Sequence, residues 1–131
     1  MTEVIKISYP KTAAGKKDWN KRYSLNAYWR GKPYYERAED ARFWHALTRT
    51  AMDAAHCRKH PFENPVEIVI FWDDALDVDN HAAMGKMIVD AMKGRVIKDD
   101  SRKWLKRLSH DWNEDGIIRV EVREVENAQK D

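Results

Sequence analysis

A short acidic segment, residues 73–80, carries the residues of this chain that are best suited to chemistry. It follows directly after an apolar stretch and places four carboxylates within seven residues, those of Asp73, Asp74, Asp77 and Asp79. If residues 77–79 are extended, the carboxylates of Asp77 and Asp79 point to the same side. Like charges held so closely repel each other, and a hard cation with oxygen ligands relieves that repulsion. The segment therefore predicts a Mg²⁺ site, with Mn²⁺ as the alternative ion. The other interpretation is an acidic turn that caps the following helix.

A third acidic position, Asp99 and Asp100, follows about twenty residues later. A helix over residues 81–93 would carry the chain about 20 Å away. An extended segment over residues 94–99 would bring it back by about the same distance. We therefore expect Asp100 to lie beside the first carboxylates and to complete a three-carboxylate site, with Asp99 in a supporting position.

One lysine lies on the same predicted helix. Lys86 follows Asp79 by seven residues, near the end of the helix that would face the acidic segment. A lysine beside a carboxylate cluster that binds phosphate would hold the scissile group or stabilise the charge that develops on it. The alternative is an exposed helix lysine near Asp90.

These residues together resemble the pattern of the RusA-type Holliday-junction resolvases, which are small prophage-associated endonucleases. In that family an Asp-x-Asp-Asn sequence opens a helix that carries a lysine and an Asp-Ala-Leu-like triplet, and an Asp-Asp pair follows a short turn. The matching residues here are Asp77-Val78-Asp79-Asn80, Lys86, Asp90-Ala91-Met92 and Asp99-Asp100-Ser101. The resemblance covers about residues 65–125, and a looser similarity extends to the asparagine and aromatic residues at 25–30.

The resemblance implies a metal-dependent homodimer that acts on branched DNA, the four-way junction. It implies that Asp77, Asp79 and Asp100 are the catalytic, metal-binding carboxylates and that Lys86 is a catalytic lysine. The reaction would be hydrolysis of a phosphodiester by a metal-activated water. A two-fold dimer would present one acidic site to each of two opposing strands. The alternative function is a DNA-binding accessory protein that keeps the fold and the basic surface without turnover.

The chain departs from the family by about three extra residues between Asn80 and Lys86. In an unbroken helix these residues would rotate the lysine by about 300° and move it by nearly one turn. If residues 81–84 instead form a longer loop and the helix begins at Gly85, Lys86 falls in the first turn and the match is restored.

The formal net charge of +2 is unevenly distributed. Residues 1–37 hold nine Lys and Arg against three Asp and Glu, which leaves 15 against 19 for the remainder. Aromatic residues are interleaved with these cations, a mixture that suits phosphate attraction combined with stacking. We predict DNA contacts at Lys16, Lys17, Lys21, Arg22, Arg30 and Lys32. A solvated lysine-rich loop whose aromatic residues pack on the core is the alternative.

Hydrophobic periodicity predicts the elements that must position these residues. Strands are expected at 4–9, 66–72 and 117–125, helices at 36–57 and 81–92, and a loop at 11–23. The first strand should lie at an edge and the second in the sheet interior. Residues 101–112 fit strand and helix spacing, and we favour a strand. The chain is predicted to be one α+β domain over residues 1–131, with one mixed sheet, two main helices and a frayed tail at 126–131. The apolar content of the first helix, including Trp44 and Leu47, favours a homodimer.

Several classes of protein are excluded on the sequence. The longest apolar run, residues 68–72, falls far short of the roughly 20 residues that span a bilayer, and no basic-then-apolar leader begins the chain. Cys57 is the single cysteine, so no intrachain disulfide forms. We expect a cytoplasmic protein that does not associate with a membrane.

Other metal sites fit the sequence poorly. A calcium EF-hand that starts at Asp77 would need glycine and glutamate where Ala82 and Ile88 stand. A nucleotide-sugar glycosyltransferase needs more chain than this one offers. His56, Cys57 and His60 would supply three of the four ligands that a structural zinc site requires.

Overall fold

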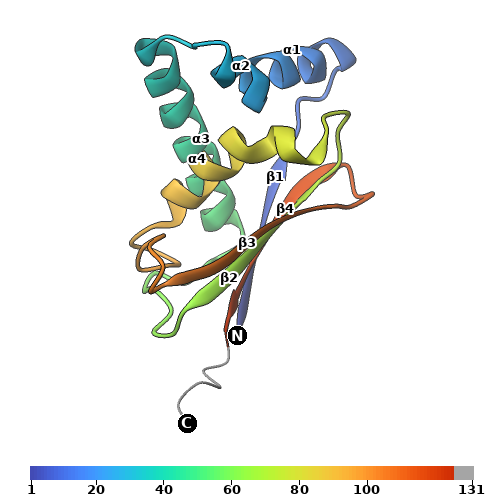
Figure 1. Ribbon diagram of the computed structural model, residues 1–131. Helices are drawn as coiled ribbons and strands as arrows, with labels where there is room; N and C mark the ends of the chain where they lie inside the picture. Colours follow the sequence, from blue (N-terminus) through green and yellow to red (C-terminus); the bar gives the residue numbers. More distant parts are fainter. Residues whose placement is uncertain (126–131) are drawn as a thin grey trace.

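A four-stranded mixed sheet forms the base of the computed structural model, which describes residues 1–125 (Figure 1). The strands are β1 (Thr2–Ser8), β2 (Val66–Trp72), β3 (Leu105–Trp112) and β4 (Ile117–Glu124), in the spatial order β1-β4-β2-β3. β2 pairs parallel with β3 and antiparallel with β4, and β4 pairs antiparallel with β1. The predicted mixed sheet, the interior position of β2 and the edge position of β1 are therefore confirmed. The predicted frayed tail, 126–131, lies outside the described residues.

Four α-helices and one 3-10 helix connect these strands. They are α1 (Ala13–Tyr23), α2 (Leu25–Trp29), α3 (Tyr34–Ala54), the 3-10 helix η1 (Val78–His81) and α4 (Ala82–Met92). In Figure 1, α3 and α4 lie on the same side of the sheet, and α1 and α2 lie together at one end of the domain. Within residues 1–125, no helix combines the length and the apolar character that crossing a membrane requires.

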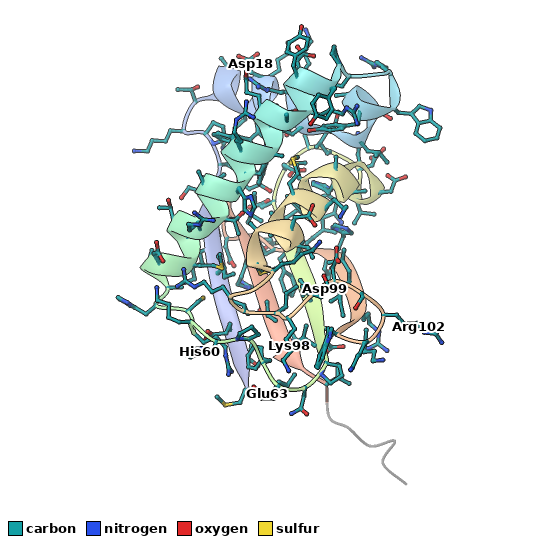
Figure 2. The ribbon with its side chains drawn as sticks, turned by 90° about the vertical axis from the view of Figure 1, so that its left-hand side faces the viewer. Asp18, His60, Glu63, Lys98, Asp99 and Arg102 are labelled. Atoms are coloured by element: carbon teal, nitrogen blue, oxygen red, sulfur yellow. The ribbon has the colours of Figure 1, made fainter. Side chains whose placement is uncertain are left out.

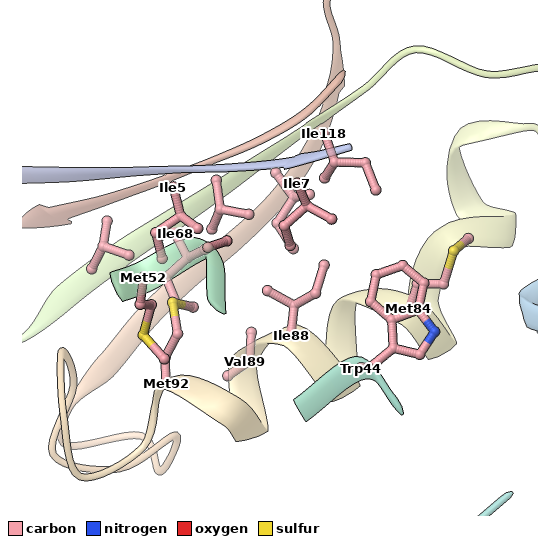
Figure 3. Packing of buried hydrophobic residues seen from close by; sticks show 14 of the residues in the cluster. Ile5, Ile7, Trp44, Met52, Ile68, Met84, Ile88, Val89, Met92 and Ile118 are labelled. Atoms are coloured by element: carbon pink, nitrogen blue, oxygen red, sulfur yellow. The ribbon is translucent and has the colours of Figure 1, made fainter. Parts of the chain in front are cut away.

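The hydrophobic core lies between the sheet and helices α3 and α4. Alternate residues of β2 and β4 are buried, because successive strand side chains point to opposite faces. Figure 3 shows Ile5 and Ile68 of the sheet on one side of this core and Met52, Ile88 and Met92 of the helices on the other. The core thereby fixes where α4 begins, immediately after the acidic segment.

The first helix predicted from periodicity, 36–57, starts two residues earlier and ends three residues earlier. Arg95 contacts this end of the helix: its guanidinium donates to the carbonyl of Met52 in the last turn and to the carbonyls of Cys57 and Arg58 beyond it. Trp44 is fully buried within the chain itself. Its apolar surface is therefore no argument for a dimer.

The prediction of a loop at 11–23 is wrong, because this segment forms α1. Thr12 caps the helix by accepting a hydrogen bond from the Gly15 amide at 2.9 Å. Trp19 and Tyr23, one turn apart, are buried against Phe43 and Trp44 of α3. Two buried aromatic residues at helical spacing hold the segment on the core, although the rest of it is polar.

The prediction of a strand over 101–112 holds for its second part. Residues 101–104 form a turn, and β3 begins at Leu105. Leu108 and Trp112 pair with Ile68 and Trp72 of β2 and so share one face of the sheet. The helical alternative for this segment is wrong from Leu105 onward.

A buried carboxylate joins the N-terminal helices to α3. Asp40, on α3, is fully buried and accepts hydrogen bonds from Arg22 Nε at 2.9 Å, from the Tyr28 hydroxyl at 2.7 Å and from Lys32 Nζ. Burial and the adjacent carboxylate raise the pKa of Tyr28, so the phenol stays protonated and donates. One carboxylate thus gathers donors from α1, from α2 and from the turn before α3.

We predict that Asp40→Ala lowers the free energy of unfolding by about 3 kcal/mol, because it leaves the nearly buried Lys32 ammonium without its counter-charge. Urea denaturation followed by tryptophan fluorescence measures this change. The matched control is Glu39→Ala, which removes an exposed partner of the same Arg22 and should cost less than about 1 kcal/mol. Equal losses in the two variants would contradict the structural role of Asp40.

Candidate functional site

Asp77 and Asp79 line one small pocket at the end of β2. The pocket has a volume of about 150 Å³, and Leu25, Asn26 and Asn80 complete its lining. Both carboxylates are exposed, and neither forms an ion pair with any residue between 1 and 125. The backbone N–H of Asn26 donates to Asn80 Oδ1 at 3.0 Å and so attaches α2 to the acidic segment. The predicted pair of carboxylates is therefore brought together, with amide groups beside it.

The other two carboxylates of the segment stabilise the fold. Asp73 Oδ2 accepts a hydrogen bond from the Gly116 amide at 2.8 Å, which joins the segment to the turn before β4. Asp74 accepts from the Tyr9 hydroxyl at 2.8 Å and from the Leu76 amide at 3.0 Å. The structure thus separates the four carboxylates into two that are hydrogen-bonded to the fold and two that are free.

His81 is the residue that holds the acidic segment in place, and the sequence analysis did not single it out. It is fully buried; its Nε2 donates to Asp74 Oδ1 at 2.8 Å, and its Nδ1 lies 3.0 Å from the Val78 carbonyl oxygen. Both ring nitrogens therefore face oxygen atoms of the acidic segment. Because Val78 lies between Asp77 and Asp79, this contact fixes the turn that carries both free carboxylates.

Burial and hydrogen bonding shift the pKa of Asp74 in opposite directions. Desolvation raises this pKa, but the hydrogen bond and charge of His81, together with the Tyr9 hydroxyl and the Leu76 amide, bring it below its ordinary value. Burial raises the pKa of Tyr9, so its hydroxyl stays protonated and donates to Asp74. The same hydroxyl accepts from the Asp73 amide at 2.8 Å. Tyr9 therefore connects the end of β1 to the start of the acidic segment.

Two tryptophan rings pack against the His81 side chain. Its ring stacks on Trp72, with centroids 4.2 Å apart, and meets the edge of Trp112. Trp72 Nε1 donates to His110 Nδ1 at 3.0 Å, and burial together with the nearby charge of His81 lowers the pKa of His110. Gly85 is required here, because a Cβ at this position would lie 2.8 Å from the His110 ring. The start of α4 is thereby held close to β3.

Lys86 lies on the second turn of α4, which begins directly after η1. The alternative with a longer loop and a helix that starts at Gly85 is therefore wrong. Lys86 Nζ lies 3.0 Å from Asp90 and 3.6 Å from Asp100, and its side chain is 65% exposed. The alternative of an exposed helix lysine near Asp90 is therefore what the structure shows, and the catalytic role of Lys86 stays a prediction.

Asp100 is held by lysines near the far end of α4. Lys93 Nζ lies 3.1 Å from its Oδ2, and the hydrogen bond from Lys93 holds the pKa of Asp100 below its usual range, with burial acting in the opposite direction. Asp77 and Asp79 precede the first residue of α4, whereas Lys93 follows its last, and eleven helical residues rise by about 16 Å. The chain after α4 therefore brings Asp100 only part of the way back along the helix toward Asp77 and Asp79.

The reason lies in the chain after α4, which is not extended as predicted. Gly94 adopts a φ of 84°, and residues 94–97 turn back so that the Gly94 amide donates to the Ile97 carbonyl at 2.7 Å. Val96 and Ile97 are buried in the core and hold this turn in place. Gly94 ends the helix as expected, but the turn shortens the reach of the segment that follows.

These positions decide how well the site fits a metal ion. In the part of the chain that the structure describes, no three His, Cys, Asp or Glu side chains are gathered to hold one together, and this includes the His56, Cys57 and His60 set. Asp99 is half-buried, and a supporting position for it stays a prediction. The pair of Asp77 and Asp79 nevertheless fits Mg²⁺, which is commonly held by one or two carboxylates plus substrate phosphate and water. The role of Asp100 as a third ligand stays a prediction.

The six predicted DNA-binding residues fall into two groups. Arg22 and Lys32 are engaged by the buried Asp40, and Arg22 also pairs with Glu39. The remaining four, Lys16, Lys17, Lys21 and Arg30, are exposed and form no ion pair within residues 1–125. These four side chains therefore contribute free positive charge at this end. In Figure 2, Asp18 of α1 marks this end, and Lys98 and Arg102 lie toward the other end.

We predict that Asp74→Asn lowers the free energy of unfolding at pH 7 by about 3 kcal/mol, because it removes the charged partner of buried His81. The folded-state pKa of Asp74 lies below the unfolded value of about 3.9, so the ionised group stabilises the fold above that pH and loses this effect as the pH falls through the folded pKa. The difference between wild type and variant should therefore narrow below about pH 4.

Urea denaturation at several pH values measures this dependence. Asp77→Asn is the matched control from the same segment, since Asp77 is exposed and makes no ion pair among the described residues. It should change stability by less than about 0.5 kcal/mol. A control as destabilised as Asp74→Asn would contradict the division between structural and free carboxylates.

Comparison of the chain with protein-family models, with curated protein sequences and with solved structures finds no significant match. The assignment of a function therefore depends on the residues and their geometry. The features that bear on it are the free pair of Asp77 and Asp79, the pairing of Asp100 with Lys93 and Lys86, and the exposed cations of α1 and α2.

Proposed function

We propose that this protein is a Mg²⁺-dependent endodeoxyribonuclease that resolves four-way DNA junctions, in the manner of the RusA-type enzymes it resembles. The observation that carries the proposal is the pair of free carboxylates, Asp77 and Asp79, in one pocket, while Asp73 and Asp74 on the same segment are hydrogen-bonded to the fold. Two exposed carboxylates without a counter-charge among the described residues provide oxygen ligands that a divalent cation can take. This arrangement supports a site that takes a divalent ion.

Asp77 and Asp79 would hold the ion, with Asp100 as the proposed third carboxylate. When bound, Mg²⁺ supplies Lewis-acid activation of water and of the scissile phosphate. The chain itself orients the two carboxylates through the contact between His81 and the Val78 carbonyl. Asn26, which lines the same pocket on α2, has a side-chain amide that can hydrogen-bond to a phosphate oxygen or to water.

Lys86 and Asp100 form the second part of the proposed site. Asp100 is shared by two ammonium groups, so a phosphate that enters beside α4 would compete with it for Lys86 and Lys93. Release of Lys86 toward the phosphate would place a positive charge where negative charge develops during the reaction. The exposure of Lys86 and its flexible side chain favour this role.

DNA is supported as the substrate by the distribution of charge. Lys16, Lys17 and Lys21 are exposed cations on α1, and the exposed Arg30 directly follows α2, the helix that lines the acidic pocket. Lysine and arginine side chains that neutralise phosphates provide most of the affinity for nucleic acid. These cations would offset the repulsion between the carboxylates and the DNA backbone.

A non-catalytic DNA-binding protein is the second candidate function. One observation favours it: Asp100 is neutralised by Lys93 and Lys86 and is not gathered with Asp77 and Asp79. On this alternative the basic side chains would bind DNA, and the acidic pocket would take no part. The two candidates differ in whether a metal ion and Asp77 are needed for strand cleavage.

We predict that Asp77→Asn and Asp79→Asn each abolish Mg²⁺-dependent cleavage of a synthetic four-way junction, by at least about 100-fold, while junction binding is unchanged or tighter. Each change removes a metal ligand and a charge that repels phosphate. Asp100→Asn should have the same effect if Asp100 joins the ligands. Cleavage is measured on end-labelled junctions with and without a chelator, and linear duplex serves as the substrate control.

Two further variants separate the proposed roles. Lys86→Ala should slow cleavage more than it weakens binding, because its charge is needed at the reacting phosphate. Lys98→Ala removes a lysine that pairs with Glu63 instead, and it should leave the cleavage rate within about two-fold of wild type. Wild-type cleavage by Asp77→Asn, or cleavage that resists the chelator, would overturn the nuclease proposal.

We also propose that the protein acts as a two-fold homodimer, because a junction has two symmetry-related strands to cut. Leu108 and Trp112, on the edge strand β3, are 40% and 44% exposed and offer apolar surface to a partner. Sedimentation at micromolar concentration should therefore give twice the chain mass of 15.5 kDa. A monomer that retains full junction cleavage would contradict this prediction.

A further inference from the structure

A second, larger cavity lies among the N-terminal helices. This cleft has a volume of about 570 Å³ and is bordered by α1, by the segment from Ala27 to Lys32 and by the first turn of α3. Asp18, which lines it on α1, marks its end of the molecule in Figure 2. A volume of several hundred Å³ is typical of sites that hold a small molecule or one unit of a polymer.

The lining of the cleft mixes charges of both signs with an aromatic face. Lys21 and Arg30 line it and form no ion pair within the described residues, and the carboxylates of Asp18 and Glu36 also remain without one there. Tyr35 lines the same cleft and is 70% exposed. A track for phosphate alone would be lined by cations only. This lining instead offers donors, acceptors and a ring face together.

Three aromatic residues close in the sequence to the residues of this cleft are exposed, and Tyr35 is the one that lines it. Trp29 ends α2 beside Arg30 and is 84% exposed, while Tyr34 and Tyr35 begin α3. Large apolar side chains so fully in contact with water are typical of binding surfaces. Flat rings beside guanidinium and ammonium groups are the combination that stacks with nucleobases and pairs with their phosphates.

The short helix α2 connects this cleft to the acidic pocket. Leu25 and Asn26, at its start, line the pocket of Asp77 and Asp79, and Ala27 and Arg30 line the cleft. Five helical residues rise by only about 7 Å. A DNA strand whose phosphate lies at the carboxylates therefore has a neighbouring nucleotide within reach of the cleft.

We propose that this cleft binds an unpaired nucleotide of the DNA substrate, with the base stacked on Tyr35 and the phosphate paired with Lys21 and Arg30. Bases in a duplex are stacked and paired, so only an unpaired base offers its ring face and its hydrogen-bonding edge. Asp18 and Glu36 line the same cleft and can accept from an N–H group on that edge, which in thymine is the ring N3–H. The inference deepens the proposed function, on which it rests for the choice of DNA, and places recognition of unpaired bases beside the carboxylate pocket.

The test measures binding of a short fluorescently labelled oligothymidylate by anisotropy, in chelator and with Asp77→Asn, so that no cleavage occurs. Tyr35→Ala should weaken this binding by about 10-fold, because a base-aromatic stack contributes on the order of 1–3 kcal/mol. Arg30→Ala should weaken it by about 5-fold through loss of a phosphate contact. Tyr34→Ala is the matched control: Tyr34 is the neighbouring tyrosine, 77% exposed, and does not line the cleft.

The control variant should change the affinity for oligothymidylate by less than about 2-fold, and Tyr35→Ala should change the affinity for a blunt duplex by no more than that. Equal losses for Tyr34→Ala and Tyr35→Ala, equal losses on duplex and oligothymidylate, or no binding of oligothymidylate would overturn the inference. If Tyr35-dependent binding is found in a protein that never cleaves junctions, the inference holds and the proposed catalytic function fails.

Discussion

The hydrogen bond between buried His81 and Asp74 is the interaction on which the candidate site depends. It joins the segment after β2 to the start of α4, and the Tyr9 hydroxyl ties the same carboxylate to the end of β1. Removing the Asp74 carboxylate would leave the buried His81 ring and the Tyr9 hydroxyl without their acceptor, and a buried polar group without a partner is destabilising. His81 also contacts the Val78 carbonyl. The same buried side chain therefore restrains the turn that carries both free carboxylates.

This constraint explains how four neighbouring carboxylates come to have different roles. Asp73 and Asp74 accept hydrogen bonds from the fold, so their charge is compensated. Asp77 and Asp79 lie on the turn that these contacts hold rigid, and they face a pocket that α2 closes from the other side. Both are exposed and have no counter-charge within residues 1–125, so their oxygens are available to a cation. The proposed metal site is thus a consequence of the buried network beside it.

The sequence predicts well those parts of the molecule whose structure depends on local pattern. A nearly continuous apolar run identifies β2, alternation of apolar and charged residues identifies β4, and Gly94 marks the end of α4. The helix α1 was missed because only two of its residues, Trp19 and Tyr23, are buried, and their partners lie on α3. Such long-range packing leaves little trace in a local pattern.

The candidate site was predictable only in part, for the same reason. The sequence predicts that Asp77 and Asp79 point to the same side if residues 77–79 are extended; the structure instead has the 3-10 helix η1 from Val78, and the two residues line one pocket. The role of His81 depends on Tyr9, whose hydroxyl meets Asp74 from 65 residues away in the chain. The position of Asp100 depends on the burial of Val96 and Ile97, which turns the chain back toward Lys93.

The most direct test of the central claim is a titration of the isotope-labelled protein with Mn²⁺, followed by amide NMR. The account predicts that line broadening centres on Asn26 and residues 77–80 and disappears in Asp79→Asn. Broadening centred elsewhere on the chain, or broadening that survives in Asp79→Asn, would contradict it.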